Sequence, residues 1–148
     1  MNLHLHDIVD HLGVAYRVEG LIAYQMANQV LRLARLVSGS VDKLLALPTS
    51  NLADRLPLLS AIPALDLAVP PPSTIYHAGE SFLLKVSGSA TVTIAGVVPG
   101  FAPGSCELWR YRAAGDRFLQ IESWPKAIRM FEGASVHRSM LDIRPATT

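Results

Sequence analysis

The chain from residue 80 to residue 124 alternates apolar and polar side chains with a period of two, and this pattern constrains the fold most. Such a period is typical of strands with one buried face, because successive side chains of a strand point to opposite faces. The alternating segments are 82–86, 89–94, 107–112 and 117–122. Turn residues separate them at Ser87-Gly88, in the Pro/Gly loop 99–104 and in the loop 113–116. The sequence therefore predicts an antiparallel β region.

The last two segments predict a hairpin, in which Gly115 supplies the left-handed residue that a short loop needs. The predicted register places three pairs opposite each other: Arg112 and Arg117, Tyr111 and Phe118, Leu108 and Ile121. One face then holds Trp109, Tyr111 and Phe118, and the other holds Leu108, Arg110, Leu119 and Ile121. Because both faces carry large apolar groups, we expect one face on the core and the other on a helix or a neighbouring subunit.

The first part of the chain has a different pattern. Apolar residues recur at spacings of 4, 4, 4, 3 and 4 along the series Val18, Ile22, Met26, Val30, Leu33 and Val37. On a helix this spacing forms a single apolar stripe. Gly20 weakens that helix by about 1 kcal/mol relative to alanine. The pattern predicts an N-terminal helical arm.

Three consecutive prolines at positions 70–72 divide the chain, because such a run favours a stiff, extended connector. The predicted organisation is a helical arm over 1–68, a Pro-rich connector over 69–73 and an antiparallel β domain over 74–148. The predicted fold class is α+β: an N-terminal helical arm followed by an antiparallel β-sandwich or small β-barrel.

Composition limits the partners. Half of the 148 residues are apolar and the mean hydropathy is +0.29, yet no apolar run approaches the roughly 18–20 residues of a membrane span. We therefore expect the surplus apolar surface to lie in contacts between subunits, with an unusually apolar internal core as the alternative. A net charge of +1, from 13 basic and 12 acidic residues, predicts no nucleic-acid partner, and we expect no membrane partner. No secretory signal is expected, because no basic region followed by an apolar run opens the chain.

The sequence contains one cluster of metal-binding residue types, His4, His6 and Asp7. A metallo-hydrolase needs further ligands downstream, so we expect no bound metal and no cofactor. The chain lacks a nucleophile elbow and a glycine-rich phosphate loop. Its single cysteine, Cys106, fits a small buried residue better than a nucleophile. We therefore predict a protein that is not an enzyme.

The order of segments in the β region resembles the β modules of phage virion proteins. The resemblance rests on the strand 89–94, the Pro/Gly loop, the strand 107–112, the Gly-Asp loop and the aromatic return strand 117–122. Head-decoration and tail-fibre proteins carry such modules. The resemblance covers residues 81–122 and implies a location in a virion; otherwise we expect a cytoplasmic protein. It assigns no binding residue.

We therefore predict a non-enzymatic structural subunit of a larger symmetric assembly, such as a phage capsid or tail component. Its predicted partners are copies of itself and other assembly subunits. The predicted interface residues are Ile22, Met26, Val30, Leu33, Trp109, Tyr111, Phe118, Arg110, Arg112 and Arg117, the arginines pairing with an acidic neighbour. Two alternatives remain: a non-viral binding or adaptor module, and a small metal-dependent hydrolase that uses the N-terminal histidines.

Overall fold

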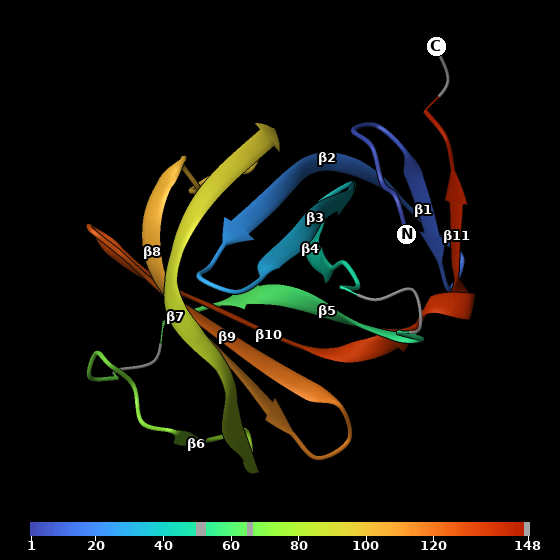
Figure 1. The fold of residues 1–148 in the computed structure, drawn as a ribbon. Coiled ribbons are helices and arrows are strands. Elements are labelled where there is room, and N and C mark those ends of the chain that lie inside the picture. Colours follow the sequence, from blue (N-terminus) through green and yellow to red (C-terminus); the bar gives the residue numbers. More distant parts are fainter. Residues whose placement is uncertain (50–52, 65–66, 147–148) are drawn as a thin grey trace.

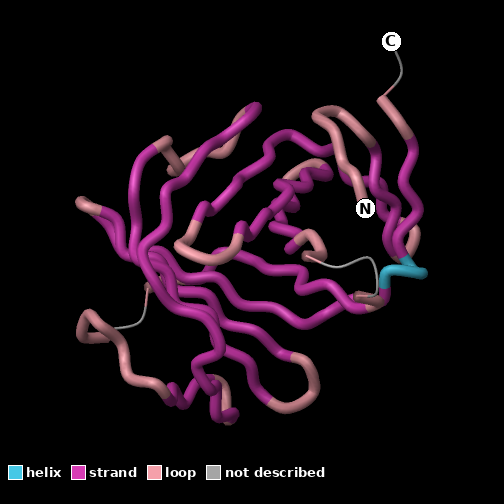
Figure 2. Tube along the Cα trace, in the orientation of Figure 1, coloured by secondary structure: helices cyan, strands magenta, loops and turns pink. Residues whose placement is uncertain are grey.

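The protein is described by a computed structural model over residues 1–49, 53–64 and 67–146, and these residues form an antiparallel sheet (Figures 1 and 2). One three-residue 3-10 helix, Arg138–Met140, is the only helix in the described part of the chain. The strands are β1 (Ile8–His11), β2 (Val14–Gln25), β3 (Val30–Ser38), β4 (Val41–Ala46), β5 (Arg55–Ile62), β6 (Thr74–His77), β7 (Glu80–Gly96), β8 (Gly104–Ala113), β9 (Arg117–Trp124), β10 (Ala127–His137) and β11 (Leu141–Arg144). No helix among these residues is long and apolar enough to cross a membrane.

Eight of the strands close into a barrel. Its order is β2-β3-β4-β5-β10-β9-β8-β7, and the pairing of β2 with β7 closes the ring. The two long strands β2 and β7 reach beyond the barrel (Figure 1). The first part of β2 pairs with β1, which pairs with β11, and the first part of β7 pairs with β6. The barrel thus carries two small extensions, each ending in a short edge strand.

The predicted α+β class and its N-terminal helical arm are wrong, because residues 14–37 form the strand pair β2–β3. A spacing of four residues fits a strand as well as a helix, since four is twice the strand period of two. Ile22 and Tyr24 therefore lie on the inner face of β2, and Met26, directly after the strand, packs in the same core. A bulge between Val18 and Gly20 moves Val18 to the opposite face, which no spacing rule anticipates.

The predicted hairpin exists as β8–β9, but its register is shifted by one residue. Arg117 lies opposite Ala113, and Tyr111 lies opposite Leu119. The loop between the strands holds three residues, 114–116, where four were predicted. A shift of one residue moves the side chains of β9 to the opposite face relative to those of β8. Phe118 therefore lies inside the barrel, while Tyr111 lies outside it.

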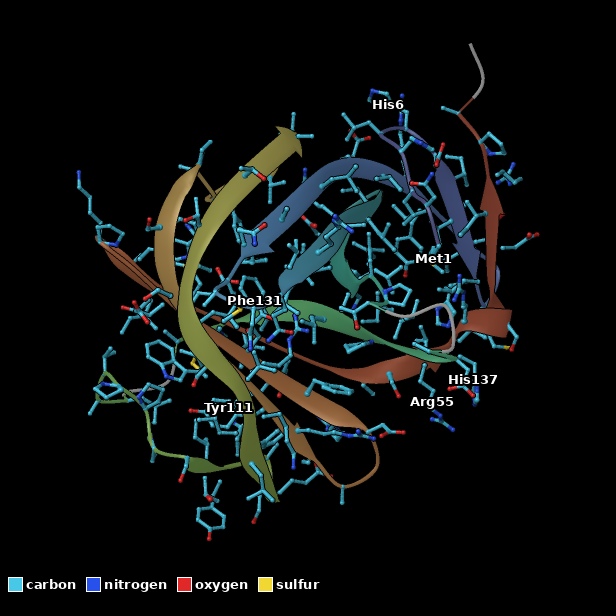
Figure 3. The ribbon with its side chains drawn as sticks, in the orientation of Figure 1. Met1, His6, Arg55, Tyr111, Phe131 and His137 are labelled. Atoms are coloured by element: carbon cyan, nitrogen blue, oxygen red, sulfur yellow. The ribbon has the colours of Figure 1, made fainter. Side chains whose placement is uncertain are left out.

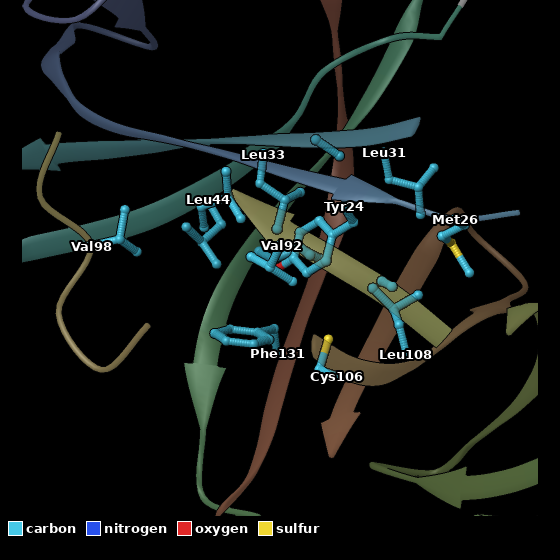
Figure 4. Packing of buried hydrophobic residues seen from close by; sticks show 14 residues of the cluster. Tyr24, Met26, Leu31, Leu33, Leu44, Val92, Val98, Cys106, Leu108 and Phe131 are labelled. Atoms are coloured by element: carbon cyan, nitrogen blue, oxygen red, sulfur yellow. The ribbon is translucent and has the colours of Figure 1, made fainter. Parts of the chain in front are cut away.

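Three separate cores bury the apolar side chains. The first fills the barrel, where the side chains labelled in Figure 4 point toward one another. The second lies on the outer face of β2 to β5, where Leu3 and Val9 from the N-terminal segment and β1 contact residues such as Leu36 and Leu45. The third lies on the outer face of β7 to β10, where Ile75 of β6 covers the wall. Much of the apolar surplus is therefore buried within one chain.

The Pro-rich connector packs against the barrel and does not separate two units. The Tyr111 hydroxyl donates a 2.8 Å hydrogen bond to the Pro72 carbonyl, and the Leu84 N–H donates one of 2.9 Å to the Ser73 carbonyl. Strands from both sides of the connector alternate around the ring, since β2 pairs with β7 and β5 pairs with β10. The chain before and after the connector therefore builds one barrel.

Candidate functional site

A buried carboxylate, Glu122, lies at the centre of a polar network on the inner wall of the barrel. It is fully buried, as are Gln120 and Tyr24. Its Oε2 accepts hydrogen bonds from the Tyr24 hydroxyl at 2.6 Å and from Gln120 Nε2 at 2.7 Å. Its Oε1 accepts one from Trp124 Nε1 at 2.9 Å. Three donors thus surround the carboxylate, which satisfies a polar group that burial would otherwise destabilise.

Arg110 continues this network along β8. Its Nε and Nη2 both donate to Gln120 Oε1, at 3.0 Å and 2.7 Å. An arginine offers only donors, so this contact fixes the Gln120 amide with its NH₂ group toward Glu122. The two residues face each other across the β8–β9 ladder, as Leu108 and Glu122 do. Hydrogen bonds therefore link Arg110 to Trp124 through two side chains.

The electrostatics follow from burial. Desolvation raises the pKa of Glu122, and the hydrogen bonds from Tyr24, Trp124 and Gln120, followed by the charge of Arg129, oppose that rise. Burial, together with the Glu122 charge, raises the pKa of Tyr24 well above its usual value. The Tyr24 hydroxyl therefore remains a donor at any physiological pH. The three donors occupy three of the roughly four lone-pair positions of the carboxylate, and full burial keeps Glu122 away from the solvent.

Residues 97–103, here called the plug loop, close one end of the barrel. Val98 is buried in the barrel core, and Phe101 packs against the same core. The Phe101 ring stacks on Phe131 with a centroid distance of 5.9 Å and meets Trp124 edge-on at 6.1 Å. The Val97 carbonyl accepts a hydrogen bond of 3.0 Å from Arg35. We call this end of the barrel the mouth.

Arg129 lies at the mouth without an acceptor. It is half-buried, and its guanidinium carbon lies 5.1 Å from the centre of the Phe101 ring. A Cβ atom at Gly100 would lie 2.5 Å from Arg129 Nη1, so the guanidinium packs directly on this glycine. No carboxylate or carbonyl of the described residues forms a hydrogen bond or an ion pair with it. The N–H donors of this cation therefore form no hydrogen bond within the described residues, while the charge of Glu122 acts on it through space.

Two hollows flank the plug loop, and Arg129 lines both. The smaller one, about 140 Å³, lies toward Phe131 and Leu59. The larger one, about 340 Å³, is here called the mouth hollow. Its lining residues are Gly100, Ala102, Pro103, Gly104, Ser105, Trp124, Pro125, Lys126, Ala127 and Arg129. This set holds two cations and no carboxylate.

The predicted interface residues divide between the interior and the surface. Fully or largely buried are Ile22, Met26, Leu33, Trp109 and Tyr111, while half-buried or exposed are Val30, Arg110, Arg112, Arg117 and Phe118. Two of the predicted arginines pair within the chain, Arg112 with Asp116 and Arg117 with Glu80 at 3.1 Å. As an interface between chains the set stays a prediction; within this chain its apolar members belong to the cores.

The N-terminal histidines do not gather around a hollow. His4 and His6 are exposed, and His6 points away from the barrel and far from Phe131 (Figure 3). No group of three or more His, Cys, Asp or Glu side chains in the described part of the chain is placed to hold a metal ion. Asp7 instead accepts hydrogen bonds from the His4 and Ala146 N–H groups, at 2.8 Å and 2.9 Å. It ties the two ends of the chain together.

Cys106 is buried inside the barrel, as predicted. Burial, followed by the charges of Glu122 and Glu107, raises the pKa of its thiol to about 12. Since the thiolate is the reactive form, this cysteine is inert at neutral pH.

A family model matches residues 4–138 of the chain, which include all eight barrel strands together with β1 and β6. The chain belongs to the family described as a domain of unknown function, DUF4178. No curated protein and no solved structure matches it significantly. The resemblance of this DUF4178 chain to phage virion modules stays a prediction.

Proposed function

We propose that this DUF4178 domain is a non-enzymatic binding module whose ligand site lies at the mouth and on the outer surface of the barrel. The observation that carries the proposal is the filled interior. An eight-stranded barrel is just wide enough either to be filled by side chains or to hold one small ligand. Here Tyr24, Leu33, Leu108 and Phe131 meet in the middle, and the plug loop closes the mouth. A ligand therefore has to bind outside this core.

The state of the reactive groups supports a role without catalysis. Glu122 accepts three hydrogen bonds, and the Cys106 thiol is held in its protonated form. A general base has to come within reach of its substrate, and a cysteine has to form a thiolate before it acts as a nucleophile. Glu122 is fully buried and Cys106 stays a thiol, whereas Arg129, which forms no hydrogen bond within the described residues, is suited to binding.

A thermal-shift screen with matched anionic, neutral and cationic small molecules tests this proposal. We expect an anion to raise the Tm, since only the liganded native state is stabilised by mass action. Mass spectrometry of the ligand recovered after a long incubation should show it unchanged. Turnover of the ligand, or the absence of any stabilising compound, would contradict a non-enzymatic binding module.

The predicted role as an assembly subunit is a second candidate, and the free edge strand β6 favours it. β6 pairs only with β7 among the described residues, and an unpaired edge is a template for another chain. Tyr76 on β6 is 80% exposed and Leu83 on β7 is 47% exposed. Light scattering should then give a multiple of the 16.0 kDa chain mass that falls when Tyr76 is replaced by Lys. A monomeric wild type would contradict this candidate.

A further inference from the structure

We propose that the mouth hollow binds a small aromatic carboxylate. Arg129 donates hydrogen bonds to its carboxylate group, and the positive charge of Lys126 attracts it. This inference rests on the proposed binding function and names the ligand class of its site.

The position of Arg129 carries the anionic half of the inference. Glu122 lies directly opposite Arg129 in the β9–β10 register, yet its oxygens accept hydrogen bonds from other residues and it interacts with Arg129 through charge alone. The guanidinium instead packs on Phe101 and Gly100, which hold it at the rim of the hollow. A guanidinium that is half-buried and lacks an acceptor is a ready site for an anion. Its planar fork matches the two oxygens of a carboxylate.

The charge of the lining points the same way. Lys126 lies exposed in the turn between β9 and β10, and Arg129 follows three residues later. No Asp or Glu lines the hollow. Glu122 is fully buried and accepts a hydrogen bond from the Trp124 indole, and its charge acts on Arg129 through space. The lining itself offers an anion two cations and no carboxylate.

The apolar part of the lining carries the aromatic half. Besides the two cations, the lining includes the Trp124 ring and the aliphatic side chains of Pro103, Pro125 and Ala127. The polar Nε1 of Trp124 is already bound to Glu122, so the indole presents only ring surface to the hollow. Aromatic rings stack favourably on indole. A volume of about 340 Å³ is near the lower end of small-molecule sites, which favours a ligand of one or two rings.

Isothermal titration of the full chain with 2-naphthoate tests the inference, with 2-naphthalenemethanol and acetate as the matched neutral and ring-free probes. We expect 2-naphthoate to bind. The neutral 2-naphthalenemethanol and the ring-free acetate should each bind about tenfold or more weakly than 2-naphthoate. R129Q should weaken 2-naphthoate binding about tenfold or more, and R129K should recover part of it because it restores the charge without the fork. K126Q should weaken it less. K85Q removes an exposed lysine elsewhere and should change nothing.

The two tryptophans of the chain give a readout that needs no variant. Trp124 lines the hollow, whereas Trp109 is buried in the outer core beneath β6. In a ¹H–¹⁵N spectrum, 2-naphthoate should shift the indole N–H signal of Trp124 and leave that of Trp109 unchanged.

The inference is overturned if 2-naphthoate fails to bind at millimolar concentration. It is also overturned if R129Q binds 2-naphthoate as well as the wild type does, or if 2-naphthalenemethanol binds as well as 2-naphthoate. A shift of the Trp109 signal in place of the Trp124 signal would overturn it too. A failure here differs from a failure of the proposed function. If another compound of the thermal screen binds while 2-naphthoate does not, the binding module stands and this site falls. If 2-naphthoate binds and is chemically changed, the site stands and the non-enzymatic role falls.

Discussion

Arg129 and Glu122 lie directly opposite each other in the β9–β10 ladder, and they form no ion pair. Tyr24, Gln120 and Trp124 occupy the Glu122 oxygens, and the Arg129 guanidinium lies over Phe101. The carboxylate of Glu122 thus lies in the interior of the barrel, and the guanidinium of Arg129 lies at the mouth. This arrangement of a cross-strand pair of opposite charge underlies both proposals, since a direct ion pair with Glu122 would take up some of the Arg129 donors and much of its charge.

Replacing Glu122 by Gln should destabilise the fold. The substituted amide keeps the shape of the side chain but presents an NH₂ group to donors, so at least one of Tyr24, Gln120 and Trp124 loses its acceptor. Hydrogen bonds to a charged group contribute about 1.5–3 kcal/mol, and we expect the free energy of unfolding to fall by about this amount. Urea denaturation followed by circular dichroism measures the change.

Glu107→Gln is the matched control for this prediction. Glu107 is exposed and accepts a hydrogen bond from Ser89 on the outer face of the barrel. Surface substitutions of this kind stay within about 0.5 kcal/mol. An E122Q protein as stable as E107Q would show that the network contributes nothing to folding.

The alternating pattern of residues 80–124 predicted strands where β7, β8 and β9 lie, because strand period depends on local alternation alone. It also predicted a turn at Ser87-Gly88, where β7 runs on without a break. Gly88 adopts φ +153, and a bulge after Leu84 bends the strand. This curvature arises because the strands close into a ring, and a local pattern of residues carries no information about that closure.

The site was harder to predict than the strands. Gln120 and Glu122 alternate with Leu119 and Ile121, and the sequence analysis assigned them no role. They are buried because the barrel curls their face of the strand inward. One feature of the sequence could have indicated this burial. Both faces of the hairpin carry large apolar groups, so both faces should be buried, and Glu122 with them. The lack of a partner for Arg129 depends on contacts with residues 100 and 101, which no sequence spacing specifies.

Asp7 should make the protein sensitive to acid. The hydrogen bond from the His4 N–H, more than that from Ala146, holds the pKa of Asp7 below its usual 3.8. A depressed pKa stabilises the native state above the unfolded value, and this stability is lost as the pH falls through the folded pKa. We expect the wild-type Tm to drop below about pH 4 more steeply than the Tm of Asp7→Asn, as differential scanning fluorimetry would record.

Asp142→Asn serves as the control for this acid response, because Asp142 is exposed on β11. It should leave the slope of Tm against pH close to that of the wild type. Parallel curves for the wild type and D7N between pH 5 and pH 2.5 would remove Asp7 from the explanation.

The Cys106 thiol should resist alkylation in the native protein. Its side chain is 4% exposed, and burial raises its pKa to about 12, so little thiolate forms at pH 8. Iodoacetamide should label the native chain far more slowly than the urea-unfolded chain, which mass spectrometry resolves because the chain has one cysteine. Native labelling at the rate of a free thiol would mean that the barrel core opens readily.

Gly20→Ala should loosen the plug loop, because a Cβ at this position of β2 would lie 2.7 Å from the Val97 carbonyl oxygen and press on the Val98 side chain. Overpacking of this kind costs about 1–3 kcal/mol. The Val97 N–H bond to the Glu19 carbonyl, 2.8 Å long, should weaken as the loop shifts away. Hydrogen exchange should therefore quicken in residues 97–101. Ala15→Ser adds one atom at an exposed position of the same strand and should change neither stability nor exchange. Unaltered exchange in the G20A plug loop would show that Val97 and Val98 are not held against β2.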